Sequence, residues 1–312
     1  MRILVMGTGG LGGYFGGLLA RAGGDVTFVA RGTNLEALQK HGLSVWSVNG
    51  DFTLPNVQAC ADPSGLPQAD FVLFTVKTYG VGDATALLQP VVGPDTVLLT
   101  LQNGVDTPGY LQQAFGRGTV LAGITRIGST LIEPGVIEQP TRDRAIEYGS
   151  LDERGEAALE RVRELLEAAG IPVQLSRDIR KSLWEKLVLI SAFAGQSALT
   201  GLTPNQLLAR QPTRTVYAQV MEETAAVARA AGVNLAADTA TQVLAYLDAE
   251  GELGSASMAV DFQHRRRTEI EAINGAVVRH GQRLGVPTPV NETIYASLVV
   301  MDGYRREEGG QS

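Results

Sequence analysis

The 312-residue chain contains a single cysteine, Cys60, so no disulfide can form within it. Disulfide frameworks are typical of secreted proteins, and their exclusion favours a reducing compartment. No apolar run approaches the roughly 18 residues that a membrane-spanning helix needs. The apolar run at residues 3–6 is too short for the core of a signal peptide. We therefore expect a soluble, cytoplasmic protein.

Basic residues are also fewer than acidic ones: the chain has 26 lysines and arginines and 33 aspartates and glutamates, which gives a net charge of −7. Nucleic acids and anionic membrane surfaces both need a basic footprint, so neither is an expected partner. The three histidines, His41, His264 and His280, show no metal-ligand spacing, and no cysteine pair accompanies them. We therefore predict no metal site.

The order of apolar runs predicts an α/β fold in two domains. Continuous apolar runs at 3–6, 26–30, 71–76 and 97–101 are typical of strands buried on both faces of a parallel sheet, and β-branched segments follow at 120–132, 136–138 and 173–177. Helical patterns then succeed one another at 182–198, 213–231, 236–250 and 257–284. We predict an N-terminal Rossmann-type doubly wound sheet over residues 1–176 and an all-helical C-terminal domain over 177–312, with a disordered tail at 309–312.

A glycine motif directly follows the first predicted strand and consists of Gly7, Thr8, Gly9, Gly10, Leu11 and Gly12. A helical pattern and a second apolar run come next, which is the strand–helix–strand context that a dinucleotide-binding motif needs. In that motif the first glycine permits a tight turn, the second lets the backbone approach the pyrophosphate, and the third lets the helix pack closely. A glycine turn without a ligand is the alternative, but the context favours a dinucleotide cofactor.

Arg31 stands at the end of the second predicted strand, where an NAD site usually carries a carboxylate for the ribose 2′-hydroxyl. The next carboxylate is Glu36, and a guanidinium suits a 2′-phosphate instead, so we predict NADPH/NADP+ as the cofactor. Lys77 and Asn103 follow two further strands, at the edge where open α/β sheets bind ligands. Lys77 is expected to meet a cofactor phosphate or ribose, and Asn103 to bridge cofactor and substrate. The alternative is that all three are ordinary surface or loop residues.

Lys186 lies in an apolar helical segment, where lysine is rare unless it is paired, reaches solvent or is functional. Reduction of a ketone needs a proton donor at the carbonyl oxygen, and a partly desolvated ammonium can serve. Ser257, Asp261 and Glu269 are expected near one stripe of a later helix, where a hydroxyl and a carboxylate can hold a small polar substrate. A solvated helix face is the alternative for that stripe.

In this order the residues resemble the ketopantoate reductases, also called 2-dehydropantoate 2-reductases. The resemblance covers nearly the whole chain and rests on the glycine motif, Arg31, Val76-Lys77, Leu101-Gln102-Asn103-Gly104, Trp184-Glu185-Lys186, Ser257-Met258 with Asp261, and Arg267-Thr268-Glu269-Ile270. It implies that Lys186 is the proton donor and that Glu269 belongs with it in catalysis. It also implies that Ser257 and Glu269 contact the substrate and that Lys77 and Asn103 contact NADPH. Asn103 falls in the first predicted domain and Lys186 in the second, so we expect the active site between them.

The chain departs from this family one and two turns after the lysine, where members often carry asparagines that help to hold the substrate. Ile190 and Ala194 stand there, with Ser191, Gln196 and Ser197 as polar groups nearby. Losing two amides from a polar pocket removes hydrogen bonds worth about 1 kcal/mol each.

Three functions remain open on the sequence. The first is reduction of 2-dehydropantoate to pantoate in pantothenate biosynthesis. The second is reduction of another branched or bulky 2-oxo acid by an NADPH enzyme of the same fold. The third is an NADPH-binding redox sensor without turnover, which Lys186 together with Glu269 disfavours, because a sensor needs no proton donor. The expected partner is the small 2-oxo acid substrate, and the sequence leaves a homodimer open.

Overall fold

The structure, a computed structural model, describes residues 1–251 and 253–309, with side chains described up to residue 304. The chain forms two compact units, each with its own buried core. Unit 1 contains Met1–Gln102 and Thr107–Ile179, and unit 2 contains Asn103–Asp106 and Arg180–Ser312.

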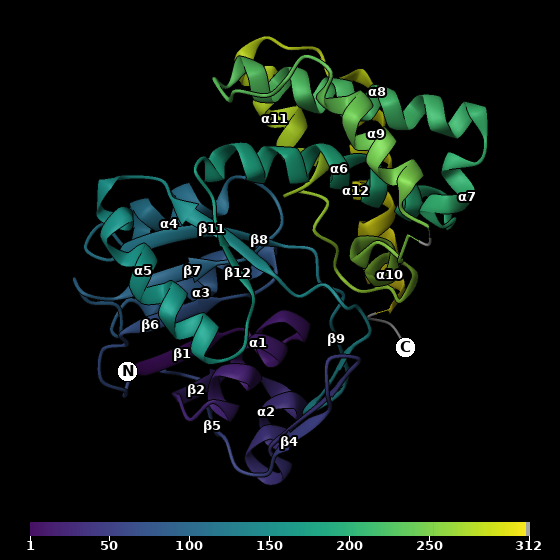
Figure 1. Ribbon diagram of the computed structural model, residues 1–312. Coiled ribbons are helices and arrows are strands. Elements are labelled where there is room, and N and C mark those ends of the chain that lie inside the picture. Colours follow the sequence, from purple (N-terminus) through teal and green to yellow (C-terminus); the bar gives the residue numbers. More distant parts are fainter. Residues whose placement is uncertain (252, 310–312) are drawn as a thin grey trace. The chain divides into compact units, whose positions relative to one another are not determined.

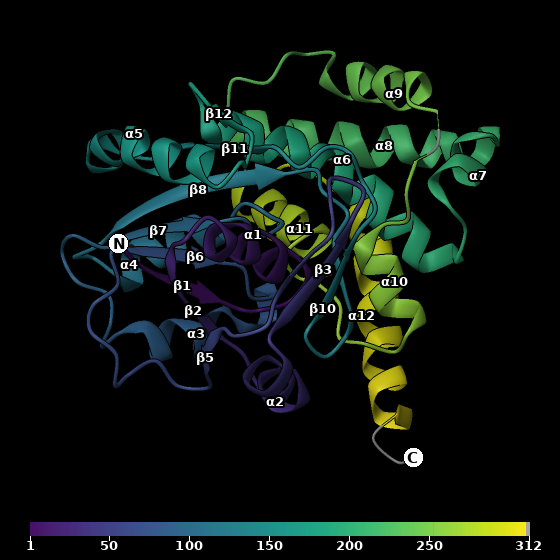
Figure 2. The same cartoon turned by 60° about the horizontal axis from the view of Figure 1, so that its bottom comes forward.

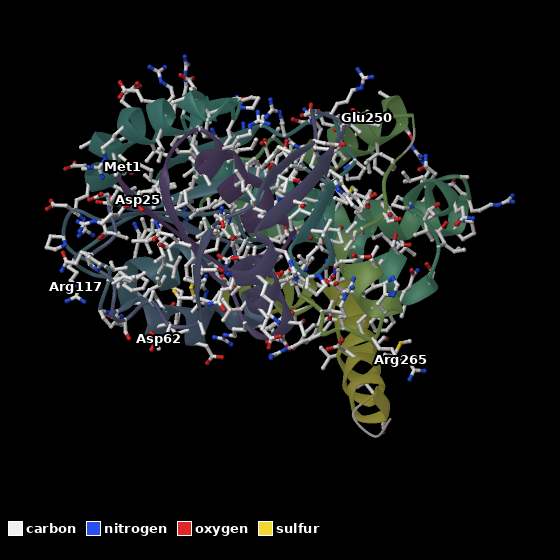
Figure 3. The ribbon with its side chains drawn as sticks, turned by 90° about the horizontal axis from the view of Figure 1, so that it is seen from below. Met1, Asp25, Asp62, Arg117, Glu250 and Arg265 are labelled. Atoms are coloured by element: carbon white, nitrogen blue, oxygen red, sulfur yellow. The ribbon has the colours of Figure 1, made fainter. Side chains whose placement is uncertain are left out.

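Unit 1 is built on a large parallel sheet (Figure 1). Its strands are β1 (Arg2–Met6), β2 (Asp25–Val29), β5 (Gln58–Cys60), β6 (Phe71–Phe74), β7 (Val97–Thr100), β8 (Thr119–Thr125), β11 (Ile146–Ser150) and β12 (Val173–Leu175), in the spatial order β12-β11-β8-β7-β6-β1-β2-β5. All neighbours are parallel except β8 and β11. The chain winds outward from β1 in both directions, which confirms the predicted doubly wound sheet. Figure 3 shows Met1 and Asp25 at the same edge, as the pairing of Arg2 with Asp25 requires.

Helices cover both faces of this sheet (Figure 2). They are α1 (Gly10–Arg21), α2 (Gly32–His41), η1 (Thr78–Gly80), α3 (Val81–Leu88), α4 (Thr107–Ala114) and α5 (Glu153–Ala168). Ile3 and Val5 of β1 enter the core formed with α1 and α5, whereas Leu4 and Met6 enter the core formed with α3 and α4. Because both faces are buried, the strand needs apolar residues at every position, and this is why the sequence shows a continuous apolar run.

A second sheet was not predicted from the sequence. It contains β4 (Phe52–Leu54), β3 (Leu43–Ser47), β10 (Val136–Gln139) and β9 (Thr130–Glu133), in that order. It also packs against α1: a Cβ at Gly13 would lie 2.6 Å from Ile137 of the small sheet, whereas one at Gly16 would lie 2.7 Å from Val5 of the large sheet. Helix α1 therefore packs against two sheets.

Unit 2 contains α6 (Ile179–Thr200), α7 (Pro204–Leu208), α8 (Gln211–Ala230), α9 (Thr239–Ala249), α10 (Ser257–Gln263), α11 (Asn274–Leu284) and α12 (Pro289–Gly309). Its described residues form no strand, which confirms the helical character predicted for this part of the chain. Of the tail expected to be disordered, Gly309 ends α12 and residues 310–312 lie outside the described residues. None of the described helices combines the length and apolar character that crossing a membrane requires.

The prediction of one helix over residues 257–284 is wrong, because α10 ends at Gln263 and α11 begins at Asn274. Arg265, which lies at the surface of unit 2 (Figure 3), adopts the left-handed conformation with φ +55°. The backbone N–H of Arg266 then bonds to the carbonyl of Asp261 at 2.8 Å, which closes the helix end. This turn contains no glycine or proline, and buried Ile270 continues the apolar pattern beyond it, so the sequence carries no stop signal.

Candidate active site

The glycine motif forms a turn at the carboxyl end of β1. Gly7 has φ +98°, and a Cβ there would lie 2.7 Å from the backbone nitrogen of Val76. A Cβ at Gly12 would lie 2.0 Å from the carbonyl oxygen of Gly7. The fold itself therefore requires both glycines. A Cβ at Gly9 would meet no protein atom within 4 Å, so this glycine leaves the backbone open to close approach from outside the protein.

The N-terminus of α1 adjoins this turn and is an anion-binding end. The helix begins at Gly10 with no acidic residue in its first turn, and its first amides lack partners within the helix. A Cβ at Gly10 would lie 2.2 Å from the carbonyl oxygen of Ser129, so the segment before β9 passes directly over this helix end. The Ser129 hydroxyl oxygen is buried and has no hydrogen-bond partner among the described residues. No sequence motif pointed to Ser129.

Side-chain hydrogen bonds connect three neighbouring strand ends at this edge. Thr75, after β6, donates to the carbonyl oxygen of Gly7 at 2.9 Å. Gln102, after β7, donates to the carbonyl oxygen of Val76 at 2.9 Å and accepts from Thr100. Lys77 directly follows Val76 and is half-buried. The structure thus places Lys77 next to the glycine turn.

Arg31 lies beside the same turn, as the residue that precedes α2. Its backbone is extended, its side chain is exposed, and no ion pair to it is found among the described residues. Two contacts bring the glycine turn to it: Thr8 donates to the carbonyl oxygen of Val29 at 3.1 Å, and Asn34 of α2 donates to the carbonyl oxygen of Thr8 at 2.8 Å. A guanidinium without a neighbouring carboxylate is suited to bind an anion at the end of β2.

Lys186 is half-buried on α6, in unit 2. With 3.6 residues per helical turn, Ile190 and Phe193 follow it on the same face, and both are half-buried. Trp184 points to the opposite face, where it is buried and its ring contacts the His280 ring edge-on at 5.4 Å between centroids. Lys186 therefore projects from the less buried side of an otherwise core-forming helix.

The polar residues near Lys186 are already engaged in the helical core. Ser191 is fully buried and bonds to the hydroxyl of Thr224 at 3.0 Å, and Gln196 donates to the carbonyl oxygen of Thr213 at 3.4 Å. Ser197 is the exception, because its hydroxyl is buried without a hydrogen-bond partner among the described residues. Neither Ser191 nor Gln196 therefore supplies a polar group at the face of α6 where Ile190 follows Lys186.

Glu269 is buried, with 6% of its surface exposed, and lies in the turn between α10 and α11. The expected helical stripe of Ser257, Asp261 and Glu269 is therefore wrong: Ser257 is the exposed first residue of α10, and Asp261 binds Arg266 at 2.8 Å. Of these three residues, only Ser257 and Asp261 lie on the same helix, α10. The carbonyl oxygen of Glu269 accepts the amide of Ala272 at 3.0 Å, which shapes the turn.

Asn103 belongs by its contacts to unit 2, as the first residue of segment Asn103–Asp106, although the chain on both sides of this segment belongs to unit 1. Gly104 has φ +91°, and a Cβ there would lie 2.6 Å from the carbonyl oxygen of Ala272. Asn103 and Glu269 thus occupy adjoining segments. Of the predicted site residues, the glycine motif, Arg31 and Lys77 share unit 1, while Asn103, Lys186, Ser257 and Glu269 share unit 2.

A doubly wound sheet with a glycine turn at β1, followed by a helical unit, defines a Rossmann-type dinucleotide-binding oxidoreductase architecture. Two family profiles match the chain: "Ketopantoate reductase PanE/ApbA" over residues 3–153 and "Ketopantoate reductase PanE/ApbA C terminal" over residues 178–301. The chain belongs to this family. It is an oxidoreductase of the 2-dehydropantoate 2-reductase type, and its reaction class is the reduction of a 2-oxo acid with a nicotinamide cofactor.

Individual relatives match this chain over nearly its full length. A 2-dehydropantoate 2-reductase of Nostoc sp. is 30% identical over 97% of this chain and 95% of its own. A ketopantoate reductase structure from Ralstonia eutropha has a TM-score of 0.89 at 32% identity and covers 98% of this chain and 100% of its own. D-mandelate dehydrogenase, solved with NADH and anilino(oxo)acetate, has a TM-score of 0.89 at 22% identity over 98% of this chain and 99% of its own, which shows a shared fold.

The glycine turn yields a first prediction. Gly12→Ala should destabilise the protein by about 3 kcal/mol, because the new methyl group would overlap the Gly7 carbonyl. Gly9→Ala should change stability by less than about 0.5 kcal/mol, since nothing in the protein meets its Cβ, yet it should weaken dinucleotide binding. Thermal unfolding without cofactor and fluorescence titration with NADPH measure the two effects. Equal losses of stability in both variants would contradict this assignment.

Proposed function

We propose that the chain is an NADPH-dependent reductase that converts a 2-oxo acid to the 2-hydroxy acid, with 2-dehydropantoate as the first candidate substrate and pantoate as its product. The observation that carries the proposal is Lys186, a half-buried ammonium in the same compact unit as the buried Glu269. Relatives that are 2-dehydropantoate 2-reductases support 2-dehydropantoate as the substrate, and pantothenate biosynthesis is the corresponding pathway. A homodimer and a cytoplasmic location stay predictions.

The residues of unit 1 fit a dinucleotide. We assign the pyrophosphate to the first-turn amides of α1, which Gly9 leaves open and which have no acidic neighbour in that turn. The buried, unpartnered hydroxyl of Ser129 adds a further hydrogen-bonding group at the same helix end. Arg31 is assigned to the 2′-phosphate and Lys77 to another polar group of the cofactor, and Asn103 of unit 2 is assigned a further cofactor contact. When bound, NADPH supplies the hydride.

The residues of unit 2 supply the proton and hold the substrate. Lys186 protonates the carbonyl oxygen as negative charge develops on it, and a preorganised cation stabilises that charge more in the transition state than in the ground state. Glu269 holds the substrate hydroxyl, the lysine, or both. Ser257, exposed at the start of α10, receives the substrate carboxylate. Asn103 is assigned the role of bridging cofactor and substrate.

A second candidate function is favoured by the side chains next to Lys186. Ile190 presents hydrocarbon one turn on, and Ala194 is buried two turns on. Ser191 and Gln196 have their hydrogen bonds in the core, so neither replaces an amide at this face. A branched or bulky 2-oxo acid with an apolar side chain needs no hydrogen bond there, and the reaction would otherwise be the same.

The cofactor assignment predicts the effect of Arg31→Ala. The Michaelis constant for NADPH should rise by about tenfold or more, because a charge-assisted contact to the 2′-phosphate is lost, while that for NADH should barely change. Lys40→Ala, which removes an exposed cation from α2, the helix that Arg31 precedes, is the matched control and should leave both constants unchanged. Steady-state rates with both cofactors provide the measurement. Equal use of NADPH and NADH by the unaltered protein would disprove the assignment.

The catalytic assignment predicts that Lys186→Ala lowers turnover at saturating 2-oxo acid by about 10²-fold or more, the usual scale for a general acid. Its affinity for NADPH should change little, because the proposed cofactor residues lie mostly in unit 1. Lys181→Ala, also on α6 and paired with Glu185 at 3.7 Å, controls for loss of a lysine from this helix. Near-normal turnover in Lys186→Ala would show that the lysine is structural.

The two candidate substrates are separated by a pair of acids that differ in one hydroxyl, 2-dehydropantoate and 3,3-dimethyl-2-oxobutanoate. For the unaltered protein, a higher kcat/KM with the hydroxylated acid supports the first candidate, and the reverse supports the second. The double variant Ile190→Asn with Ala194→Asn should shift the ratio of the two kcat/KM values toward 2-dehydropantoate by up to about 30-fold, because each amide adds a hydrogen bond of about 1 kcal/mol. An unshifted ratio would remove these positions from the substrate site.

A further inference from the structure

Four residues between β7 and α4 leave the sheet unit and pack on unit 2. Gly104 approaches the carbonyl of Ala272 so closely that only a residue without a side chain fits, and Val105 joins the apolar core of the helices. The segment 103–106 is therefore seated on the turn that carries Glu269.

Asp106 fastens the end of this segment to α11. One carboxylate oxygen contacts Nε2 of His280 at 2.6 Å, and the other accepts from Arg279 at 3.3 Å. Arg279 also binds the side chain of Glu271 at 3.0 Å and its carbonyl oxygen at 2.9 Å, so the same guanidinium connects Asp106 to the turn. Burial tends to raise the pKa of Asp106, but the hydrogen bond from His280, together with the charge and hydrogen bond of Arg279, outweighs it and holds the pKa below its ordinary value.

The contacts of His280 determine which ring nitrogen donates and how the ring is oriented. A guanidinium nitrogen of Arg283 lies 2.8 Å from Nδ1, and guanidinium groups only donate, so Nδ1 accepts and Nε2 carries the proton that Asp106 receives. The Trp184 ring packs edge-on against the imidazole, and only 16% of the His280 side chain is exposed. The donor that faces Asp106 is thereby held in one direction.

We propose that Asp106 is a positioning residue, whose carboxylate, held by His280 and Arg279, keeps Asn103 against the turn that carries Glu269. This inference rests on the proposed function, in which Asn103 bridges cofactor and substrate. Without the contact with His280 and Arg279, segment 103–106 would no longer be fastened to α11 and would move with β7, the strand that precedes it in the chain. Asn103 then loses its place relative to Glu269, and a displacement of about 1 Å in such a group can cost up to about 10²-fold in rate.

The test uses the full-length protein and three variants. Asp106→Asn removes the charge, and His280→Phe removes the donor while keeping an aromatic ring against Trp184. Asp248→Asn is the matched control, because it breaks another aspartate–arginine pair of unit 2, with Arg214 at 2.7 Å. Hydrogen exchange should be at least about tenfold faster for the amides of residues 103–106 in the first two variants and unchanged in the control. Unchanged exchange in Asp106→Asn would overturn the proposal whatever the activity.

Kinetics test whether the contact acts through Asn103. Asp106→Asn and His280→Phe should each lower kcat/KM for the 2-oxo acid by about tenfold or more, and Asp248→Asn should not. In an Asn103→Ala background the same substitutions should have almost no further effect, a coupling that a general loss of stability would not produce. Independent, multiplying effects would overturn the positioning role. An unaltered protein that reduced no 2-oxo acid would instead refute the proposed function.

Discussion

Helix α1 packs against two sheets, and the position of its N-terminus follows from that double contact. Gly16 allows close approach to the large sheet and Gly13 to the small one, so the helix axis cannot shift toward either sheet. Each glycine inside a helix costs about 0.5–1 kcal/mol relative to alanine, which burial of apolar surface against both sheets offsets. The result is a helix end held at the carboxyl edge of β1, directly beside the turn at Gly7 and below the segment that contains Ser129.

The chain carries net negative charge, yet it gathers cationic groups at particular places. Arg31 and Lys77 both stand where strands of the large sheet end, next to the glycine turn. They are brought there by the parallel arrangement, because parallel strands end at the same edge of the sheet. The local electrostatics of a site is thus independent of the overall charge of the chain.

Unit 2 depends on buried polar contacts between helices that are far apart in the sequence. The carboxylate of Glu223 on α8 accepts the side-chain amide of Asn291 on α12 at 2.8 Å, and Asn274 donates to the carbonyl oxygen of Ser191 on α6 at 3.0 Å. Buried groups of this kind are costly unless they are satisfied, so they favour one arrangement of the helices over others. The turn that contains Glu269 leads into α11, which begins at Asn274. These contacts therefore help to hold the helix that adjoins the proposed substrate-binding turn.

The sequence by itself determined the parallel sheet, the glycine turn and the helical second half, because each has a strong local signature. A strand buried on both faces needs a continuous apolar run, and the turn at Gly7 and Gly12 tolerates only glycine. These features, with Arg31, Lys77 and Lys186, can be recognised without coordinates. The ordered set of motifs also led to the family.

Only the tertiary structure decided the rest. The small sheet has strands of three to five residues, too short for a clear period, and they are defined by their contact with α1. The helix break at Arg265 depends on a left-handed residue that is not glycine, held by Asp261 and Arg266. The attachment of Asn103 to unit 2 depends on Asp106 meeting His280, 174 residues away in the sequence. Local pattern cannot reveal such contacts, because they arise only when distant parts of the chain are brought together.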